Sequence, residues 1–389
     1  MDIFELESRH TPGLYAKRDV ALVRGEGALL WDSNGKQYID CDSGHGVANL
    51  GHCRPEIAKA IGEQATRLVT CFESYYNDQR ALLLEKLTSL TPGLERAYLC
   101  NSGTEAVEAA IKFARFATGR TKIVAAMRGF HGRTMGALSA TWNKHYREPF
   151  EPLVPGFSHI AYNNVEALQK AVDGETAAVL LEAVQGEGGI YVGSAEFLLA
   201  AQALCRQHGA LLIVDEVQSG FARTGKMFAY QHTDGLAPDM LCVAKSIAGG
   251  VPMGATLLGQ RVKPLQPGLH ASTFGGNPLS CAASLVALDL LERENLAQQA
   301  AEKGAYLIEQ LTKIQSPLLR EVRGIGLMVG IELKQKIAPY LRALTANGVL
   351  ALPSGMTVLR FLPPLVISYE QLDRVVAVVE QVLNQTSEE

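Results

Sequence analysis

The sequence contains few cysteines, and they form no recognisable pattern. Among its 389 residues there are seven cysteines, an odd number, scattered singly and without a C-x-x-C pair. Such a set argues against a disulfide framework or a cysteine-bound zinc site, so we expect reduced thiols that mostly pack in the core. The nine histidines include no H-x-x-x-H pair. A zinc-dependent mechanism therefore has no support.

Excess charge and long apolar runs are also missing. Lysine and arginine number 36 against 40 acidic residues, a net charge of −4, with no basic block. This balance argues against general binding to nucleic acid or to anionic membranes. The chain has no window of about 18 uninterrupted apolar residues, and its first ten residues are acidic and polar rather than basic and then apolar. We therefore expect a cytoplasmic protein without a membrane span.

The apolar content and its spacing predict a large α/β protein. Hydrophobic residues make up 47% of the chain, enough for a large core, and the length suggests two or three domains. A hairpin is expected over 28–40, and helical spacing begins near Arg54 and continues to Leu90. Strands and helices then alternate over 97–258, which predicts right-handed crossovers in a mainly parallel sheet. Residues 295–389 read as a smaller α+β unit.

Two apolar runs, each ending in a charged residue, form the centre of the pattern. Residues 210–215 end in Asp215 and residues 241–245 end in Lys245, as expected of two buried parallel strands. In open α/β sheets, ligands bind beyond the carboxyl ends of the strands. A lysine amine and a carboxylate there suit pyridoxal phosphate, because the amine condenses with its aldehyde and the carboxylate keeps its pyridine nitrogen protonated. A plain ion pair between the two residues is the alternative.

Two polar segments suggest phosphate contacts. The turn 101–104 precedes a predicted helix over 105–117, and the free N–H groups at such a helix start can hold a phosphate. An ordinary serine or threonine N-cap is the alternative. The loop 270–278 is rich in glycine and hydroxyl groups, so it suits either a second phosphate contact or a flexible connection.

Other candidate residues carry aromatic or cationic side chains. In the segment 128–134, Phe130 could stack on a pyridine ring and Arg133 could bind a carboxylate, although both could belong to a surface loop. Arg360 lies in an apolar run, where a guanidinium needs an anion. That anion is either a substrate carboxylate or an internal acidic side chain.

Two glycine-rich motifs carry no function in our interpretation. Residues 220–227 differ by one position from a nucleotide P-loop, but Met227 lacks the hydroxyl that would bind Mg²⁺, and no helix pattern follows. Nucleotide binding is therefore kept only as a rival hypothesis, which Met227 disfavours. The glycines of 324–330 lie within a predicted strand, so they are no dinucleotide fingerprint.

Taken together, these segments resemble the class III (ω-amino-acid) aminotransferases, which are pyridoxal-phosphate enzymes of fold type I. The resemblance extends over nearly the whole chain, from Tyr15 to Pro364. Its most specific segments are Asn101-Ser-Gly-Thr-Glu105, Phe130-His-Gly-Arg-Thr134, Asp215-Glu-Val-Gln-Ser-Gly-Phe-Ala-Arg-Thr-Gly225, Ala244-Lys245 and Ser272-Thr-Phe-Gly-Gly-Asn277. The resemblance implies a large domain with a mainly parallel central sheet and a smaller α+β domain. We divide the chain into 1–50 (N-terminal part of the small domain), 51–290 (large cofactor-binding domain) and 291–389 (C-terminal small domain).

The resemblance also implies a role for each cofactor-binding residue. Lys245 would bind the aldehyde covalently and later move a proton between the substrate and C4′ of the cofactor. Asp215 would pair with the pyridinium nitrogen, Gln218 would bind the phenolic oxygen, and Phe130 would stack on the ring. The phosphate would be held by Ser102, Gly103, Thr104 and Thr273 of the partner subunit. The expected assembly is an obligate homodimer with shared active sites.

The substrate residues follow from the same resemblance. Arg360 would bind the α-carboxylate of glutamate, and Glu187 would mask Arg360 when an ω-amino substrate enters. Arg133 and Ser272 would contact the acylated amino substrate, and Tyr15 is placed in the same group. One pocket could then accept both glutamate and a terminal amine.

Within the family, the chain resembles most the branch of acetylornithine aminotransferases and of enzymes that aminate a lysine precursor linked to an acidic carrier protein. It departs from the family pattern at Val107, usually asparagine, and at Ala183, usually proline. His45 stands where ornithine aminotransferases have tyrosine, which argues against free ornithine. Rival hypotheses are another class III reaction, on succinylornithine, ornithine or 4-aminobutyrate, and a cofactor-binding protein without turnover.

Overall fold

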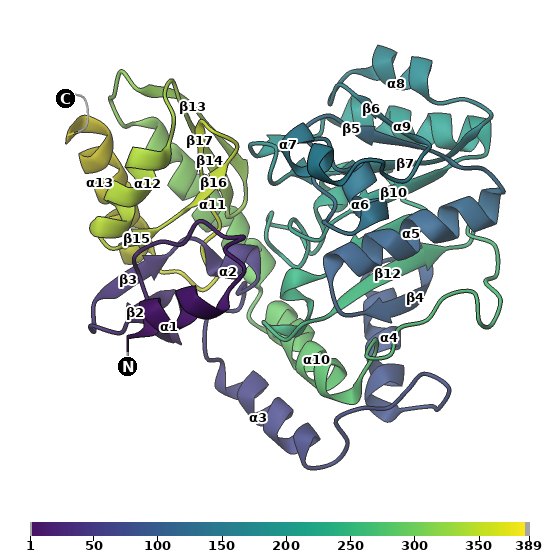
Figure 1. Cartoon of the computed structure of the whole chain (residues 1–389), viewed down its shortest axis with the longest axis horizontal. Coiled ribbons are helices and arrows are strands. Elements are labelled where there is room, and N and C mark those ends of the chain that lie inside the picture. The colour runs from purple at the N-terminus through teal and green to yellow at the C-terminus, as the bar shows by residue number, and fades with distance from the viewer. Residues whose placement is uncertain (1, 386–389) are drawn as a thin grey trace.

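The computed structural model describes residues 2–385 and has two lobes (Figure 1). The large lobe is built around the long central sheet. The small lobe contains the first strands of the chain together with its last helices, so both chain ends lie on the same side of the molecule.

The central sheet is mixed but mainly parallel, as predicted. Within residues 2–385 it has seven strands in the order β4-β12-β11-β10-β7-β5-β6. Only β12 runs antiparallel to its neighbours β11 and β4. The strands are β4 (Leu94–Cys100), β5 (Lys122–Ala126), β6 (Phe157–Ile160), β7 (Thr176–Glu182), β10 (Leu211–Asp215), β11 (Met240–Val243) and β12 (Gly254–Gly259). Strands β7, β10 and β11 are buried along their whole length, which explains their continuous apolar sequences.

Helices cover the central sheet. The long helix α5 (Gly103–Thr118) begins at the N-cap Ser102 and ends at Gly119, whose φ of 70° is the left-handed value that favours glycine at a helix end. Its inner face is rich in alanine, which allows close packing on the strands. The other helices of this lobe are α3 (Pro55–Ala65), α4 (Asp78–Ser89), α6 (Met135–Ala140), α7 (Lys144–Arg147), α8 (Val165–Ala171), α9 (Ala195–His208) and α10 (Pro278–Arg293).

The helical spacing predicted from Arg54 to Leu90 belongs to two helices, α3 and α4, rather than to one continuous segment. Helix α3 ends at Ala65, so Leu68 lies beyond it and is 45% exposed instead of facing the core. The intervening residues carry no helix. The apolar spacing persists through this stretch without the tertiary packing that would make it helical.

The small lobe has two four-stranded sheets, and one of them joins the two ends of the chain. In that sheet β15 pairs in parallel with β3, so strands more than 300 residues apart in sequence lie side by side. This sheet contains β1 (Leu22–Glu26), β2 (Leu29–Asp32), β3 (Gln37–Asp40) and β15 (Val349–Leu350). The second contains β13 (Leu319–Ile325), β14 (Met328–Leu333), β16 (Leu352–Ser354) and β17 (Val358–Phe361). The predicted hairpin is the antiparallel pair β2–β3.

Helices and short elements complete the two lobes. The helices of the small lobe are α1 (Ile3–His10), α11 (Leu296–Thr312), α12 (Ala338–Ala346) and α13 (Tyr369–Gln385). The short elements are α2 (Ser43–Gly46), η1 (Glu148–Phe150), η2 (Ala229–His232), η3 (Lys245–Ala248), β8 (Val184–Gln185) and β9 (Tyr191–Val192). None of the helices in residues 2–385 is long and apolar enough to cross a membrane.

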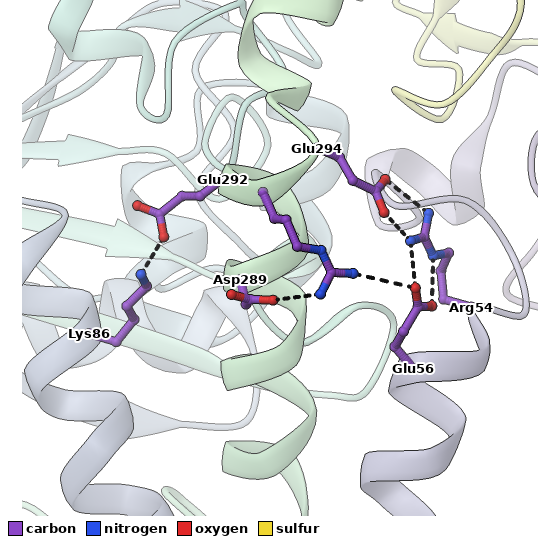
Figure 2. Close-up of polar contacts among 7 residues, drawn as sticks. Arg54, Glu56, Lys86, Asp289, Glu292 and Glu294 are labelled. Atoms are coloured by element: carbon purple, nitrogen blue, oxygen red, sulfur yellow. Dashed lines mark hydrogen bonds and ion pairs between the residues drawn. The ribbon is translucent and has the colours of Figure 1, made fainter.

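Charged side chains join three helices that are distant in sequence (Figure 2). Arg54, just before α3, donates to Glu294 at the end of α10 at 3.1 Å and also to Glu56 in the first turn of α3. Lys86 of α4 pairs with Glu292 of α10. Because α10 also packs against both α3 and α4, these pairs accompany the packing contact and add little stability of their own.

Candidate active site

A cavity of about 440 Å³ lies beyond the carboxyl ends of β4, β7, β10 and β11, where ligands bind in open α/β sheets. Most of the site residues predicted from the sequence line it. They are Ser102, Gly103, Thr104, Phe130, Arg133, Glu187, Asp215, Gln218 and Lys245. These residues come from five separate segments of the chain, and the sheet brings them together.

Asp215, the last residue of β10, is buried and held by two hydrogen bonds. Its Oδ2 is 2.8 Å from Nδ1 of His131, and its Oδ1 accepts a hydrogen bond from the Val217 amide at 3.0 Å. Burial alone would lower the pKa of His131, but the hydrogen bond to Asp215 and its charge outweigh burial and raise that pKa. The His131 ring and the Val217 amide together fix the position of the Asp215 carboxyl group. In the part of the chain described, Asp215 forms its ion pair with His131, and none joins it to Lys245.

Lys245 follows β11 by two residues and has left-handed backbone geometry, with a φ of 44°. This conformation is uncommon for a residue with a side chain, and it turns the chain sharply into η3. Burial lowers the pKa of Lys245 to about 8, although the nearby Glu187 opposes this effect. The amine is therefore much closer to neutral at physiological pH than an exposed lysine would be.

A second buried acid, Glu182, ends β7 beside Asp215. Its carboxylate accepts hydrogen bonds from the backbone amides of Phe130 at 3.2 Å and Gly186 at 3.1 Å. Burial raises the pKa of Glu182 to about 7, with the charge of Asp215 adding to the effect of burial. Glu182 therefore fixes the backbone of two cavity loops and carries a proton that it loses near neutral pH.

The start of α5 forms one end of the cavity. Ser102 is the N-cap: its Oγ accepts a hydrogen bond from the Glu105 amide at 3.3 Å, so the turn does cap the helix, and the phosphate contact stays a prediction. The amides of the first turn still point out of the helix, where its dipole favours an anion. Gly103 has no room for a side chain, because a Cβ would lie 2.6 Å from Cγ1 of Val217.

Arg133 lies over an aromatic ring at the opening of the cavity. Its guanidinium is 3.7 Å from the ring centre of Tyr146 and 5.5 Å from that of Phe130. Phe130 and Tyr146 meet edge to face, with centres 6.1 Å apart. The cation is thus placed by aromatic contacts and keeps its hydrogen-bond donors for a ligand.

Arg360, in the middle of β17, is completely buried and faces an internal acid. Its Nη1 lies 2.5 Å from Oε1 of Glu187 and donates to Oε1 of Gln218 at 2.9 Å. The same oxygen of Glu187 is 2.8 Å from Nε2 of His45. Burial would raise the pKa of Glu187, but the charge of Arg360 and the hydrogen bond from His45 hold it well below its usual range. Glu187 is therefore a carboxylate that covers Arg360.

Four predicted residues are not part of the cavity wall: Arg360, which meets it only through Glu187 and Gln218, and three residues that lie outside the cavity of their own chain. Tyr15 is 83% exposed and is not part of the cavity wall, and Thr273 is also exposed. Ser272 lies closer, because its Oγ accepts a hydrogen bond from Nδ2 of Asn101, a residue that lines the cavity. A single chain therefore does not bring these three side chains into the cavity.

No sequence pattern assigns a role to His131, Glu182 or Val217. Glu182 could have been found by the signal that identified Asp215, an acid that ends a buried apolar strand. His131 stands within the segment 128–134, but nothing in its local sequence shows that it meets Asp215, 84 residues away. The contact between Val217 and Gly103 is likewise visible only in three dimensions.

Comparisons with known proteins agree with this geometry. The family model described as Aminotransferase class-III matches residues 14–383. The chain is 53% identical to the [LysW]-aminoadipate semialdehyde transaminase of Deinococcus radiodurans, over 97% of this chain and 89% of the relative. It is 46% identical to the acetylornithine aminotransferase of Methanopyrus kandleri, over 97% of each. The crystal structure of an ornithine aminotransferase from Toxoplasma gondii matches with a TM-score of 0.95 at 34% identity, covering 99% of this chain and 95% of that one.

The side chains of the cavity fit the cofactor of that family. Pyridoxal phosphate offers an aldehyde, a pyridine nitrogen and a phosphate, and the cavity offers an amine of lowered pKa, a buried carboxylate and the open start of a 16-residue helix. Among residues 2–385 no cluster of histidine, cysteine and acidic side chains has the arrangement of a metal site. The chain belongs to the class III aminotransferases, and it is a pyridoxal-phosphate-dependent enzyme that transfers amino groups.

Proposed function

We propose that the enzyme transfers the terminal amino group of an acylated diamino acid to 2-oxoglutarate, forming glutamate. The acylated substrate is N-acetylornithine or a lysine linked to an acidic carrier protein, which places the reaction in arginine or lysine biosynthesis. The pair of Arg360 and Glu187 carries this proposal, because a covered arginine suits a pocket that admits a carboxylate in one half-reaction and an amine in the other. The names of the relatives in Deinococcus radiodurans and Methanopyrus kandleri support both substrates.

The bound cofactor supplies an electron sink for the removal of a proton from the substrate carbon that bears nitrogen. Lys245, whose amine has the lowered pKa, binds the cofactor and moves that proton through its Nζ. Asp215, held in place by His131, would pair with the pyridine nitrogen of the bound cofactor. Phe130 would lie against its ring, and Gln218 would bind its phenolic oxygen. The phosphate is assigned to Ser102, Gly103 and Thr104.

Arg360 and Glu187 distinguish the two substrates. When a terminal amine enters, Glu187 stays on Arg360 and neutralises its charge. When glutamate enters, Glu187 moves away, and the α-carboxylate takes its place on Arg360 as a charge-assisted partner. Arg133, at the opening of the cavity, binds the distal carboxylate of the acylated substrate.

The active enzyme is a homodimer in this proposal. Ser272, Thr273 and Tyr15 lie outside the cavity of their own chain, which is expected if they complete the site of the partner. Exposed apolar side chains near these segments, Phe72, Tyr75 and Phe274, would be covered on assembly. The domain boundaries at residues 50 and 290, the carrier-protein partner and the cytoplasmic location remain predictions from the sequence.

Two variants test the proposal. Lys245→Ala should remove covalent cofactor binding and all transamination while leaving the fold intact. Arg360→Ala should raise the KM for glutamate much more than the KM for the acylated amine. An equal rise in both KM values would make Arg360 structural and overturn the proposed division of roles.

Arg320→Ala is the control, because Arg320 is an exposed arginine of the same lobe. Its guanidinium pairs with Glu332, which is not part of the cavity wall. Assays of acetylornithine and of a carrier-linked lysine with the same enzyme identify the acylated substrate.

A further inference from the structure

A loop of strained backbone carries His45 to Glu187, a residue of the cavity wall. The residues from Ser43 to Gly46 all have left-handed φ values, 53°, 58°, 70° and 79° in order. Two are glycines, which adopt this conformation freely, but Ser43 and His45 carry side chains and do so rarely. Two acids stabilise the turn: Oδ1 of Asp40 accepts from the Ser43 amide at 2.8 Å, and Oδ1 of Asp42 accepts from the His45 amide at 2.6 Å. Such strain persists where a side chain has to be held in a particular place.

The His45 side chain, held by this turn, contacts Glu187, the carboxylate that pairs with Arg360. Nε2 of His45 and Nη1 of Arg360 converge on the same oxygen of Glu187, at 2.8 and 2.5 Å. A carboxylate only accepts hydrogen bonds, so Nε2 carries a hydrogen and donates it to Glu187. The approach of Arg360 Nη2 to the same Nε2, at 3.4 Å, is then a contact between two donors and no hydrogen bond. His45 and Arg360 can lie this close together only while the Glu187 carboxylate accepts hydrogen bonds from both of them.

We propose that His45 is a positioning residue that sets the preference between the two substrates by holding Glu187 on Arg360. This inference rests on the proposed function of the Arg360–Glu187 pair and adds a third member to it. The hydrogen bond from His45 exists with Glu187 in the covering position, so it favours that state over the one in which Arg360 is free. His45 therefore favours the terminal amine and opposes any ligand whose carboxylate must displace Glu187.

Half of the His45 side chain is exposed, so substitutions at this position should not disturb the core. They can therefore be chosen to test whether the side chain must be long enough to contact Glu187. In His45→Gln the amide nitrogen extends about as far from the backbone as Nε2 does, and it keeps a donor for Glu187. In His45→Asn the amide extends only as far as Nδ1, and asparagine tolerates left-handed backbone geometry well. The two variants differ in contact with Glu187 and in how well each residue tolerates the left-handed backbone, so their melting temperatures are compared as well.

The probe is glutarate, which has the two carboxylates of glutamate but no amino group to react. Its dissociation constant for the holoenzyme is measured by calorimetry. Loss of one hydrogen bond to a carboxylate should make His45→Asn bind glutarate roughly ten-fold more tightly, and His45→Gln should bind it like the native enzyme. In steady-state assays His45→Asn should lower the KM for glutamate and raise the KM for the acylated amine, with little change in kcat.

A double-mutant cycle shows whether His45 acts through Glu187. Glu187→Ala should itself tighten glutarate binding, and adding His45→Asn to it should change nothing further. Unchanged glutarate binding in His45→Asn, or an equal effect with and without Glu187, would overturn the inference. Arg360→Ala distinguishes failure of the proposed function from failure of this inference. If Arg360→Ala binds glutarate as tightly as the native enzyme, the proposed function of Arg360 is wrong. If Arg360→Ala binds glutarate more weakly but His45→Asn binds it like the native enzyme, only the role of His45 is wrong. Melting temperatures verify that every variant is folded.

Discussion

At the level of single residues, the most direct prediction concerns Lys245. Burial lowers the pKa of its amine to about 8, and only the neutral amine attacks an aldehyde. The rate at which cofactor-free enzyme captures pyridoxal phosphate should therefore rise with pH up to about 8 and then level off. Stopped-flow absorbance measures this rate, with Lys245→Ala as the control for non-covalent uptake. A rate that continues to rise toward pH 10 would mean that the amine is not buried as the structure indicates.

Gly103 gives a second prediction at this level. A Cβ at this position would lie 2.6 Å from Val217 Cγ1, so Gly103→Ala should displace the first turn of α5 or the segment after Asp215. Because the amides of that turn form the expected phosphate site, the affinity for pyridoxal phosphate should fall by roughly ten-fold or more, the free-energy cost of one misplaced charge-assisted hydrogen bond. Equilibrium dialysis measures the affinity.

The clash itself can be tested by compensation. Val217→Ala removes the methyl groups that the new Cβ would meet, so the double variant should recover much of the affinity lost in Gly103→Ala. If the double variant binds no better than Gly103→Ala alone, steric contact with Val217 is not the cause of the loss.

Some site residues can be predicted because the residues next to them in sequence mark them. Others are defined only by contacts between distant segments, and the sequence does not show them. Asp215 and Lys245 end apolar runs and could be identified from those runs alone. The sequence shows His131 as a residue but not as the partner of Asp215, since one lies in the loop after β5 and the other ends β10. The backbone φ of 44° at Lys245 was equally beyond reach, because no local residue pattern requires it.

At the level of elements, the ends of β7 and β10 should make stability depend on pH. Burial raises the pKa of Glu182, at the end of β7, and of Glu216, just after β10, to about 7 from an ordinary value of 4.5. The folded state thus binds these protons more tightly than the unfolded state. Their contribution to stability is complete below pH 4.5 and is lost as pH rises through about 7. His131, whose pKa is also raised, acts in the same direction.

Cofactor-free enzyme should therefore be less stable at pH 8 than at pH 5.5. The expected difference is roughly 2 kcal/mol for each carboxyl, measured as the free energy of unfolding in urea. Glu182→Gln, which cannot ionise, should flatten this pH dependence whatever its effect on absolute stability. A variant with the native slope would show that Glu182 does not carry the proton.

The positions of helices and strands are predictable from the sequence where apolar spacing and caps mark them. The direction and the pairing of the strands are not. Helix α5 and strand β10 lie within two residues of the bounds predicted for them, 105–117 and 210–215, since a cap or an apolar run marks their ends. The antiparallel direction of β12 within a mainly parallel sheet was not foreseen, because a fully buried strand reads the same in either direction. The pairing of β15 with β3 was not predicted either, since only the closed fold brings them together.

At the level of the whole molecule, one buried arginine joins the two lobes around the site. Arg223, in the loop after β10, donates to the backbone oxygens of Leu327 at 2.9 Å and Pro363 at 2.5 Å, both in the small lobe. It also donates to Oδ1 of Asn49 at 2.5 Å. Burial lowers the pKa of Arg223 to about 9. The guanidinium is held by these three neutral oxygen acceptors rather than by an ion pair with an acid. The loop that follows Asp215 is thereby fixed to the lobe that carries Arg360.

The shared active site predicts complementation between two inactive variants. Lys245→Ala removes the amine of its own chain, and Thr273→Arg should block the phosphate site of the partner if Thr273 reaches across the dimer. A mixed dimer then has one site with both native residues and one with neither, so about a quarter of the native activity should return after random reassociation. If each chain instead supplied its own Thr273, every site in the mixed dimer would lack one residue and no activity would return. Activity measured after the two proteins are unfolded together and refolded distinguishes these outcomes, and the same proteins refolded apart and then mixed are the control.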